Sequence, residues 1–440
     1  MTEKKQWITR KKVTLSLAIS LLVMLANYVA SNTSIPLPDE IKVLQWWDIL
    51  KKWNNIDTDS IPEEVLLVDV AYDKQLVDYA VKVDNAPIHV GQYAITDRQK
   101  LLDFLTIAHH ADNYKYIMLD VIFEEGIVSP CDSALFQMII SMPRIVIPEH
   151  EGMPLQDSIL YRKAANADYT VTWEDTDFAR FQYIHHGVKS MPLSMYEDLS
   201  GHSISKLGFL YFSRHWICRN GITLKMPIKI TKMTKNEGDK PECNVSYLGS
   251  DLLAIDSIWP INERIKDKIV VIGNFKDDIH DTYVGPQPGS IICLNAYYAL
   301  ERGDHIILGK CCGVFIFYLI IAILYFVVSI AYLNGFSLSA MTKNPWLKLL
   351  FSLVSVNVLF WTIAIIAYIL PLDTVYNVWI PIGTFTLLDF FCNIYSSYKE
   401  QRNEKNENHT VAPAACDVSG GTNESAHIQS ALHESSPDTD

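Results

Sequence analysis

Three stretches of the chain decide the fold: VLLVDV at residues 65–70, ITDRQKLLDFLTIAHH at 95–110 and KYIMLDVIF at 115–123. The first and third are short, nearly continuous apolar runs, which are typical of strands buried on both faces. The middle stretch has the apolar spacing of an amphipathic helix, with Thr96 or Asp97 as its N-cap. Strand, helix and strand in this order predict a βαβ unit, and therefore parallel strands covered by helices.

The same kind of pattern continues along the chain. Further strands are predicted at residues 144–148, 167–173, 178–186, 224–230 and 269–273, and helices at 133–141 and 294–302. An acidic turn at 174–177 predicts that 167–173 and 178–186 form a hairpin. The polar stretch 231–244 is predicted to be a loop. The expected fold is a mixed α/β domain with a largely parallel sheet.

Four apolar runs outside this domain are long enough to cross a bilayer. A helix needs about 20 apolar residues to do so. The first run lies at 13–33 and follows a basic N-terminus, so a cleaved signal peptide is the alternative to an anchor. Its length and Tyr28, close to any cleavage point, favour the anchor. Three more runs lie within 310–396, which gives four predicted transmembrane helices, one N-terminal and three C-terminal.

Basic residues predict the orientation of these helices. Residues 1–12 contain five Lys or Arg, and Lys399, Arg402 and Lys405 follow the last run. By the positive-inside rule both termini are cytoplasmic, and residues 34–309 lie outside the cytoplasm. The tail at 397–440 has few large apolar residues and is predicted to be disordered. Any cytoplasmic signal would therefore need a separate partner protein.

The net charge and the cysteines limit which classes of partner and cofactor can be expected. The net charge of −13 argues against nucleic acid as a partner, because phosphate contacts need clustered Lys and Arg. The predicted domain has four cysteines: Cys131, Cys218, Cys243 and Cys293. A Cys218–Cys243 disulfide would close the polar loop, and four free buried thiols are the alternative. No Cys/His spacing typical of a metal site is present, so no metal and no cofactor are predicted.

Acidic side chains follow several predicted strands. Asp69, Asp120 and Gly273 fall at carboxyl ends of strands, where open α/β sheets bind ligands. The candidate ligand-binding residues are Asp69, Asp97, Arg98, Asp120, Glu124, Asp278, His280 and Asp281. An acid-rich rim with one guanidinium suits a cation, an amine-bearing ligand or a polar ligand. The same residues are equally suited to cap helices and brace loops.

Enzymatic chemistry has weaker support in the sequence. Clustered carboxylates can hold Mg²⁺ or Ca²⁺, so a metal-dependent hydrolase is one alternative. However, no activated nucleophile is evident, and the pairs His109–His110 and His185–His186 are typical of solvated ends of elements. The prediction is a protein that is not an enzyme. Asp389, inside the last predicted span, either pairs with another helix or lies near the cytoplasmic interface.

Three motifs resemble a known family, the CHASE2 extracytoplasmic sensory domain of bacteria. They are LLVDVAYD at 66–73, YKYIMLDVIFEEG at 114–126 and KDKIVVIGNFKDDIHDTYVGPQPGSIICLNAYYAL at 266–300. One anchor before the domain and three spans after it also match the family. The chain departs from it at AITDRQ, residues 94–99, where a WPR-type stretch is usual and Arg98 is the matching residue. It also lacks the output domain commonly fused to this sensor.

The resemblance implies a multi-pass receptor of the bacterial inner membrane with a periplasmic sensory domain. This receptor would bind an unknown ligand and signal through its helices to a separate partner. A homodimer is expected by analogy with receptors that signal through paired helices. The alternative from another class is a structural subunit that holds an envelope assembly together.

Overall fold

The computed structural model describes residues 10–32, 44, 45, 48, 49, 61–83, 86–168, 178, 180–230, 245–307 and 347. The chain divides into two compact units, Met1–Thr386 and Leu387–Asp440. All described residues belong to the first unit. Most of the predicted C-terminal spans (310–396), Asp389, Cys243 and the tail at 397–440 lie outside the described residues.

A six-stranded sheet forms the centre of the domain, with the order β14-β1-β15-β4-β5-β6. Every pairing in it is parallel. The strands are β1 Val65–Asp69, β4 Tyr116–Leu119, β5 Ile145–Glu149, β6 Ala164–Asn166, β14 Val245–Tyr247 and β15 Ile269–Gly273. The predicted mixed α/β fold with a largely parallel sheet is therefore confirmed. The latest of these strands in the chain, β15, lies between β1 and β4.

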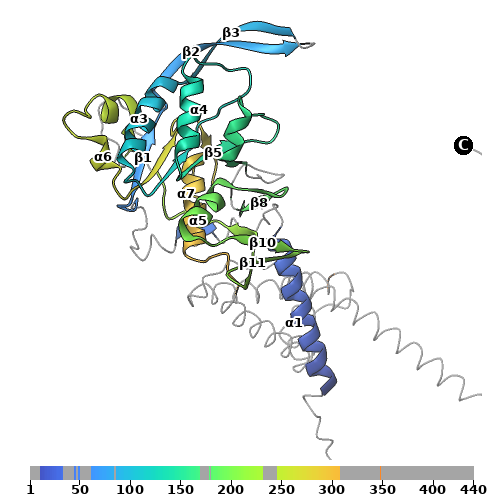
Figure 1. Ribbon diagram of the computed structural model, residues 1–440. Helices are drawn as coiled ribbons and strands as arrows, with labels where there is room; N and C mark the ends of the chain where they lie inside the picture. Colours follow the sequence, from blue (N-terminus) through green and yellow to red (C-terminus); the bar gives the residue numbers. More distant parts are fainter. Residues whose placement is uncertain are drawn as a thin grey trace, which may run out of the picture. The chain divides into compact units, whose positions relative to one another are not determined.

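Alternate residues of these strands enter two separate cores. Leu67, Met118 and Val271 pack on one face with the helices α5 Met191–Ser200 and α7 Gly289–Glu301. Their neighbours Val68, Leu119 and Ile272 pack on the other face with α3 Arg98–Ala111 and α4 Asp132–Ser141. This is the reason that the strands read as continuous apolar runs, since successive side chains point to opposite faces and both faces are covered. Figure 1 shows α3 and α4 alongside each other.

Short helices complete the two layers. A 3₁₀ helix spans Ser158–Arg162, a π-helix spans Leu248–Leu253, and α6 spans Ile261–Arg264. Their buried residues Leu160, Leu252 and Ile261 join the core formed by α3 and α4.

Antiparallel strands surround the sheet, and most of them were not predicted. The longest are β2 Lys74–Val83 and β3 Ala86–Thr96, which form the hairpin at the top of Figure 1. Because β3 includes Thr96, the helix predicted from residue 95 begins at Arg98. The others are β7 Arg180–Gln182, β8 Ile184–His185, β9 Val188–Lys189, β10 Ile204–Leu207, β11 Leu210–Ser213, β12 Trp216–Cys218, β13 Gly221–Thr223, β16 Ile279–His280 and β17 Gln287–Pro288.

One strand of the predicted hairpin of 167–173 with 178–186 lies mostly outside the described residues. Residues 169–177 lie outside the described residues, and the stretch 180–185 is divided between β7 and β8. Strand β7 pairs with β13, and β8 pairs with β9. The hairpin that the described residues form here is β8 with β9, across the His186–Gly187 turn, and the pairing of 167–173 with 178–186 stays a prediction.

The predicted strand at 224–230 was wrong in an informative way. Its alternate residues Leu224, Met226, Ile228 and Ile230 are buried, as in a strand, but the segment has no partner strand within the described chain. Side chains take the place of that strand. Asn295 pairs with both the N–H and the C=O of Ile228, at 3.1 and 2.7 Å.

Two more side chains continue this ladder. Gln287 pairs in the same bidentate way with Ile230, at 2.8 and 3.2 Å, and the Met226 N–H donates to the Tyr283 hydroxyl at 2.8 Å. The buried backbone groups are thus satisfied without a sheet, as buried polar groups must be. The alternation of apolar residues in 224–230 correctly predicted which side chains are buried. It wrongly predicted that the backbone pairs with another strand.

The N-terminal helix α1, Arg10–Ser31, is attached to the domain at its carboxyl end. The Tyr28 hydroxyl donates to the Cys218 carbonyl at 3.1 Å and accepts from the Tyr211 N–H at 2.9 Å. The Asn32 side chain accepts from the Asn220 N–H at 2.7 Å. No helix within the described residues combines the length and the apolarity needed to cross a membrane.

Candidate functional site

The strand ends bring Asp69, Asp120 and Gly273 to one edge of the sheet. Asp69 is in register with Gly273, and the Asp120 N–H donates to the Ile272 carbonyl at 2.7 Å. A Cβ atom on Gly273 would lie 3.6 Å from the Asp120 Cβ and only 2.8 Å from the Ser290 Oγ. Glycine is therefore required where β15 passes between β4 and the start of α7.

Asp69 is a buried brace. It is 2% exposed, and its Oδ1 accepts from the N–H groups of Ala71 at 2.8 Å and Phe275 at 3.2 Å. Burial raises the pKa of its carboxyl group, and these two hydrogen bonds partly oppose that rise. The side chain joins the loop after β1 to the loop after β15, so its acceptor capacity is used within the protein.

Asp120 differs, because its carboxylate has no hydrogen-bond or ion-pair partner within the described chain. It remains partly accessible. Burial, with the nearby charge of Asp278, raises its pKa to about 7, while His150 and His280 oppose the rise. An acid that is half ionised at neutral pH, and that has a free acceptor group, is a candidate for direct contact with a ligand.

Two His–Asp pairs lie within electrostatic range of Asp120. In one, the His280 Nε2 is 2.7 Å from the Asp278 Oδ1, and in the other the His150 Nδ1 is 2.7 Å from the Asp168 Oδ1. His150 follows β5 and Asp168 lies shortly after β6, so the second pair arises from the same sheet edge. The first pair comes from the loop after β15 and from β16.

The first turn of α7 forms another wall of the site. The Gly289 N–H donates to the Asp278 carbonyl at 3.1 Å, and a Cβ on Gly289 would lie 2.6 Å from the Asp278 Oδ2. The Ser290 Oγ is buried with no hydrogen-bond partner in the described structure. Burial raises the pKa of the Cys293 thiol, and the charges of Asp120 and Asp278 add to this effect. Cys293 is therefore a neutral thiol that lies close to both acids.

Arg98 does not belong to this group, contrary to the predicted rim. It is 1% exposed, its Nη2 donates to the Ile122 carbonyl at 2.8 Å, and its guanidinium lies over the Phe123 ring at 4.2 Å. Its carboxylate neighbour is Asp132, 4.0 Å from the Nε. Burial lowers the pKa of Arg98 to about 10. Tertiary packing against α4 holds this side chain inside the protein, where it cannot bridge a ligand at Asp120.

The other predicted rim residues have structural positions. Asp97 is the N-cap of α3 and accepts from the N–H groups of Gln99 and Lys100. Glu124 forms an isolated β-bridge with Leu155. Asp281 has an exposed side chain, and its backbone carbonyl accepts from the Phe178 N–H at 2.8 Å. Of the eight candidate residues, Asp120, Asp278 and His280 are thus the ones grouped electrostatically, with Asp69 bracing the same edge.

The cysteines favour the buried-thiol alternative where they are described. Cys218 is a free thiol, fully buried in the core beside α5 and α7, and Cys293 is free and buried as well. Cys131 is free and half-buried. The candidate partner Cys243 lies outside the described residues. Cys218 therefore packs as a small apolar residue, and its pairing with Cys243 stays a prediction.

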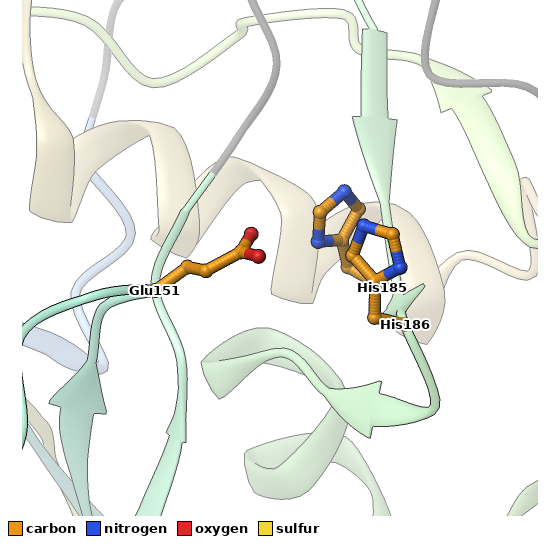
Figure 2. A group of neighbouring side chains, drawn as sticks. All are labelled: Glu151, His185 and His186. Carbon is orange, nitrogen blue, oxygen red and sulfur yellow. The ribbon is translucent and has the colours of Figure 1, made fainter.

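Sequence reasoning missed His150, Asp168 and Ser290 at this edge. The signal was present for His150, which follows the predicted strand 144–148, but not for Asp168, which follows β6, a strand at 164–166 that was not predicted. It also missed a second group at the same edge, formed by Glu151, His185 and His186 (Figure 2). No local motif identifies that group, because Glu151 is distant in sequence from the histidine pair.

Comparison with known proteins gives no match: no family model, curated protein or solved structure is similar to this chain. The resemblance to the CHASE2 domain stays a prediction.

Proposed function

We propose that this protein is a bacterial membrane receptor, not an enzyme, whose CHASE2-like extracytoplasmic domain binds a small cationic or amine-bearing ligand at Asp120. The observation that carries the proposal is the Asp120 carboxylate, partly accessible and without a partner in the described chain. The nearby acid Asp278 makes the site favourable for positive charge. An ammonium group would supply the hydrogen-bond donors and the opposite charge that Asp120 lacks.

The attachment of α1 supports a route for the signal. The hydrogen bonds of Tyr28 and Asn32 connect the carboxyl end of α1 to β11, β12 and Asn220. Displacement of these strands would therefore pull on the helix that we propose as the first membrane anchor. Signalling needs two arrangements that bind the ligand with different affinity. A separate partner, and a second copy of the chain, would read the change in helix packing.

The small sheet that contacts Tyr28 also suits a position beside a lipid surface. Four large apolar residues of this sheet and its turns are exposed: Leu207, Phe209, Trp216 and Ile217. Aromatic residues are enriched where protein meets the membrane–water interface. Their proximity to the end of α1 supports a domain anchored by that helix in the inner membrane.

A proton-release measurement tests the proposed function. Amines such as putrescine, choline and arginine are screened for a rise in melting temperature of the full chain in detergent. Binding of the best one is then followed by calorimetry at pH 7 in buffers of different ionisation enthalpy. Because Asp120 is about half protonated at this pH, a cation bound there should release up to about half a proton per site.

Two variants complete this test. Asp120→Asn should abolish binding, whereas the exposed Asp281→Asn should retain it. Binding that survives Asp120→Asn, or a screen in which no amine or cation protects the chain, would refute the proposal.

One observation favours the alternative, a structural subunit of an envelope assembly. The β2–β3 hairpin carries the exposed apolar residues Leu76 and Tyr93 on a two-stranded sheet. Such an arm is suited to contact a neighbouring protein. Stable copurification with envelope proteins, lost in a Leu76→Ser/Tyr93→Ser variant, together with no ligand protection, would favour this function over the receptor.

A further inference from the structure

We propose that Glu151, His185 and His186 form a binding site for Zn²⁺. One ligand atom of each side chain lies within 4.8 Å of those of the other two. Figure 2 shows the Glu151 carboxylate directed toward the neighbouring imidazoles of His185 and His186. This site goes beyond the proposed function, since neither the amine ligand nor Asp120 takes part in it.

Strand pairing brings these distant segments together. Glu149, at the end of β5, is in register with Asn166 of β6, and Asn166 forms a parallel bridge with Ser190, directly after β9. Because β9 pairs with β8, the hairpin that carries the two histidines lies next to the exit of β5. The position of Glu151 beside His185 therefore follows from the sheet order.

The histidine pair occupies a rigid turn. His185 pairs with Val188, which leaves His186 and Gly187 as the two central residues of the hairpin turn. Both have positive φ, at 47° and 88°, as a type I′ turn requires. The buried Asn220 anchors the strand before the turn, since it exchanges two hydrogen bonds of 2.8 Å with the backbone of Ile184. The two imidazoles are thus held on a short, well-braced element.

The backbone of Glu151 is also fixed. Its N–H donates to the Asp168 Oδ2 at 2.7 Å, and the other oxygen of Asp168 meets His150. The Glu151 side chain is exposed and is free to turn toward the histidines. Backbones held in place with mobile side-chain ends allow the three ligand atoms to contract around an ion.

The donor set selects the ion. Two imidazoles and one carboxylate are a common ligand set for zinc, with water in the fourth position. Tetrahedral zinc sites place neighbouring ligand atoms about 3.3 Å apart, given bonds of about 2.0–2.1 Å, and side-chain rotation covers the difference from 4.8 Å. Mg²⁺ and Ca²⁺ prefer oxygen ligands, so they should compete poorly here.

A bound ion would connect the exit of β5 to the β8–β9 hairpin. It would also lie close to the His150–Asp168 pair, because Asp168 holds the Glu151 backbone. Zinc should therefore raise the melting temperature of the folded chain by mass action, since Glu151 is far from the two histidines in the unfolded chain.

The test compares zinc binding by two variants of the full chain. Glu151→Gln/His185→Ala/His186→Ala removes the site, and His109→Ala/His110→Ala is the matched control. The control pair is also adjacent in sequence and has one half-buried and one exposed ring. Histidines and cysteines elsewhere contribute equally to both proteins. Calorimetry with Zn²⁺ alone should show one ion fewer for the triple variant than for wild type, and no loss for the control.

Two further readouts separate this site from misfolding and from the Asp120 site. Co²⁺ should give the visible absorption of four-coordinate cobalt in wild type and not in the triple variant, while both proteins melt at similar temperatures without metal. Asp120→Asn should keep the zinc site intact, so failure of the receptor proposal leaves this one standing. Equal zinc stoichiometry and affinity in wild type and the triple variant would overturn the proposal.

Discussion

Two strand ends on the same sheet edge carry the same residue and use it differently. Asp69 at the end of β1 and Asp120 after β4 both flank β15. Asp69 accepts two backbone hydrogen bonds, whereas Asp120 has no partner in the described chain. The strand pattern decides where an acid lies, and the backbone of the next loop decides whether it is a brace or a free group.

The largest effect should follow from removing the brace. Asp69→Ala leaves the N–H groups of Ala71 and Phe275 buried without acceptors, so the free energy of unfolding should fall by about 3 kcal/mol. Urea denaturation measures this loss. Asp69→Asn keeps an acceptor oxygen, so its free energy of unfolding should fall clearly less than that of Asp69→Ala. Equal losses for Ala and Asn would show that the hydrogen bonds do not stabilise the fold.

Asp120→Asn should raise the free energy of unfolding at neutral pH and above, whereas Asp69→Ala lowers it. Since the folded state raises the pKa of this acid to about 7, it binds the proton more tightly than the unfolded chain does. The stability associated with that proton is complete below about pH 4 and is lost as the pH rises through 7. The variant should therefore be more stable than wild type by roughly 1–3 kcal/mol at pH 8 and equally stable near pH 4. Identical pH profiles of unfolding for the two proteins would contradict this.

A smaller loss is expected at the helix cap. Asp97 accepts from two backbone N–H groups at the start of α3, and Asp97→Ala should lower the free energy of unfolding by about 1 kcal/mol. Asp97→Ser retains a capping oxygen and should recover most of that loss. Thermal unfolding of the three proteins checks the order.

The smallest effect should be at Asp281. Its side chain is exposed, and it is the backbone carbonyl that accepts the hydrogen bond from Phe178. Asp281→Ala should therefore change the free energy of unfolding by less than about 0.5 kcal/mol. A loss as large as that for Asp97→Ala would mean that the side chain has a role that its exposure does not suggest.

The sheet and its functional edge were largely predictable because burial on both faces leaves a strong local signal. The apolar runs at 65–70, 115–123 and 269–273 became β1, β4 and β15. The rule that carboxyl ends of parallel strands converge then located Asp69 and Asp120. Consistent use of the same rule after residues 144–148 would have added His150, whereas Asp168 follows β6 (164–166), which the predicted strand at 167–173 missed.

Other features depend on contacts that no local pattern contains. The β2–β3 hairpin has exposed as well as buried residues, so it lacks a continuous apolar run. Arg98 directly follows the helix cap, as a site residue could. Its side chain lies outside the site because it packs on Phe123 and near Asp132, which the local sequence does not indicate. Glu151 and His185 come close through three successive pairings, of β5 with β6, of β6 with Ser190 after β9, and of β9 with β8, which the spacing of the residues does not encode.

The ladder of side chains along residues 224–230 limits how the molecule can deform. Asn295 and Gln287 grip the backbone of Ile228 and Ile230, so the segment can slip along α7 only by two residues, a step of roughly 7 Å. A one-residue slip would turn the buried side chains outward. Any smaller shift of α7 must therefore carry this segment with it as a single rigid body. Movement at the Gly289 end of α7, which contacts Asp278, would then reach Ile228 and Ile230 through the side chains of Asn295 and Gln287.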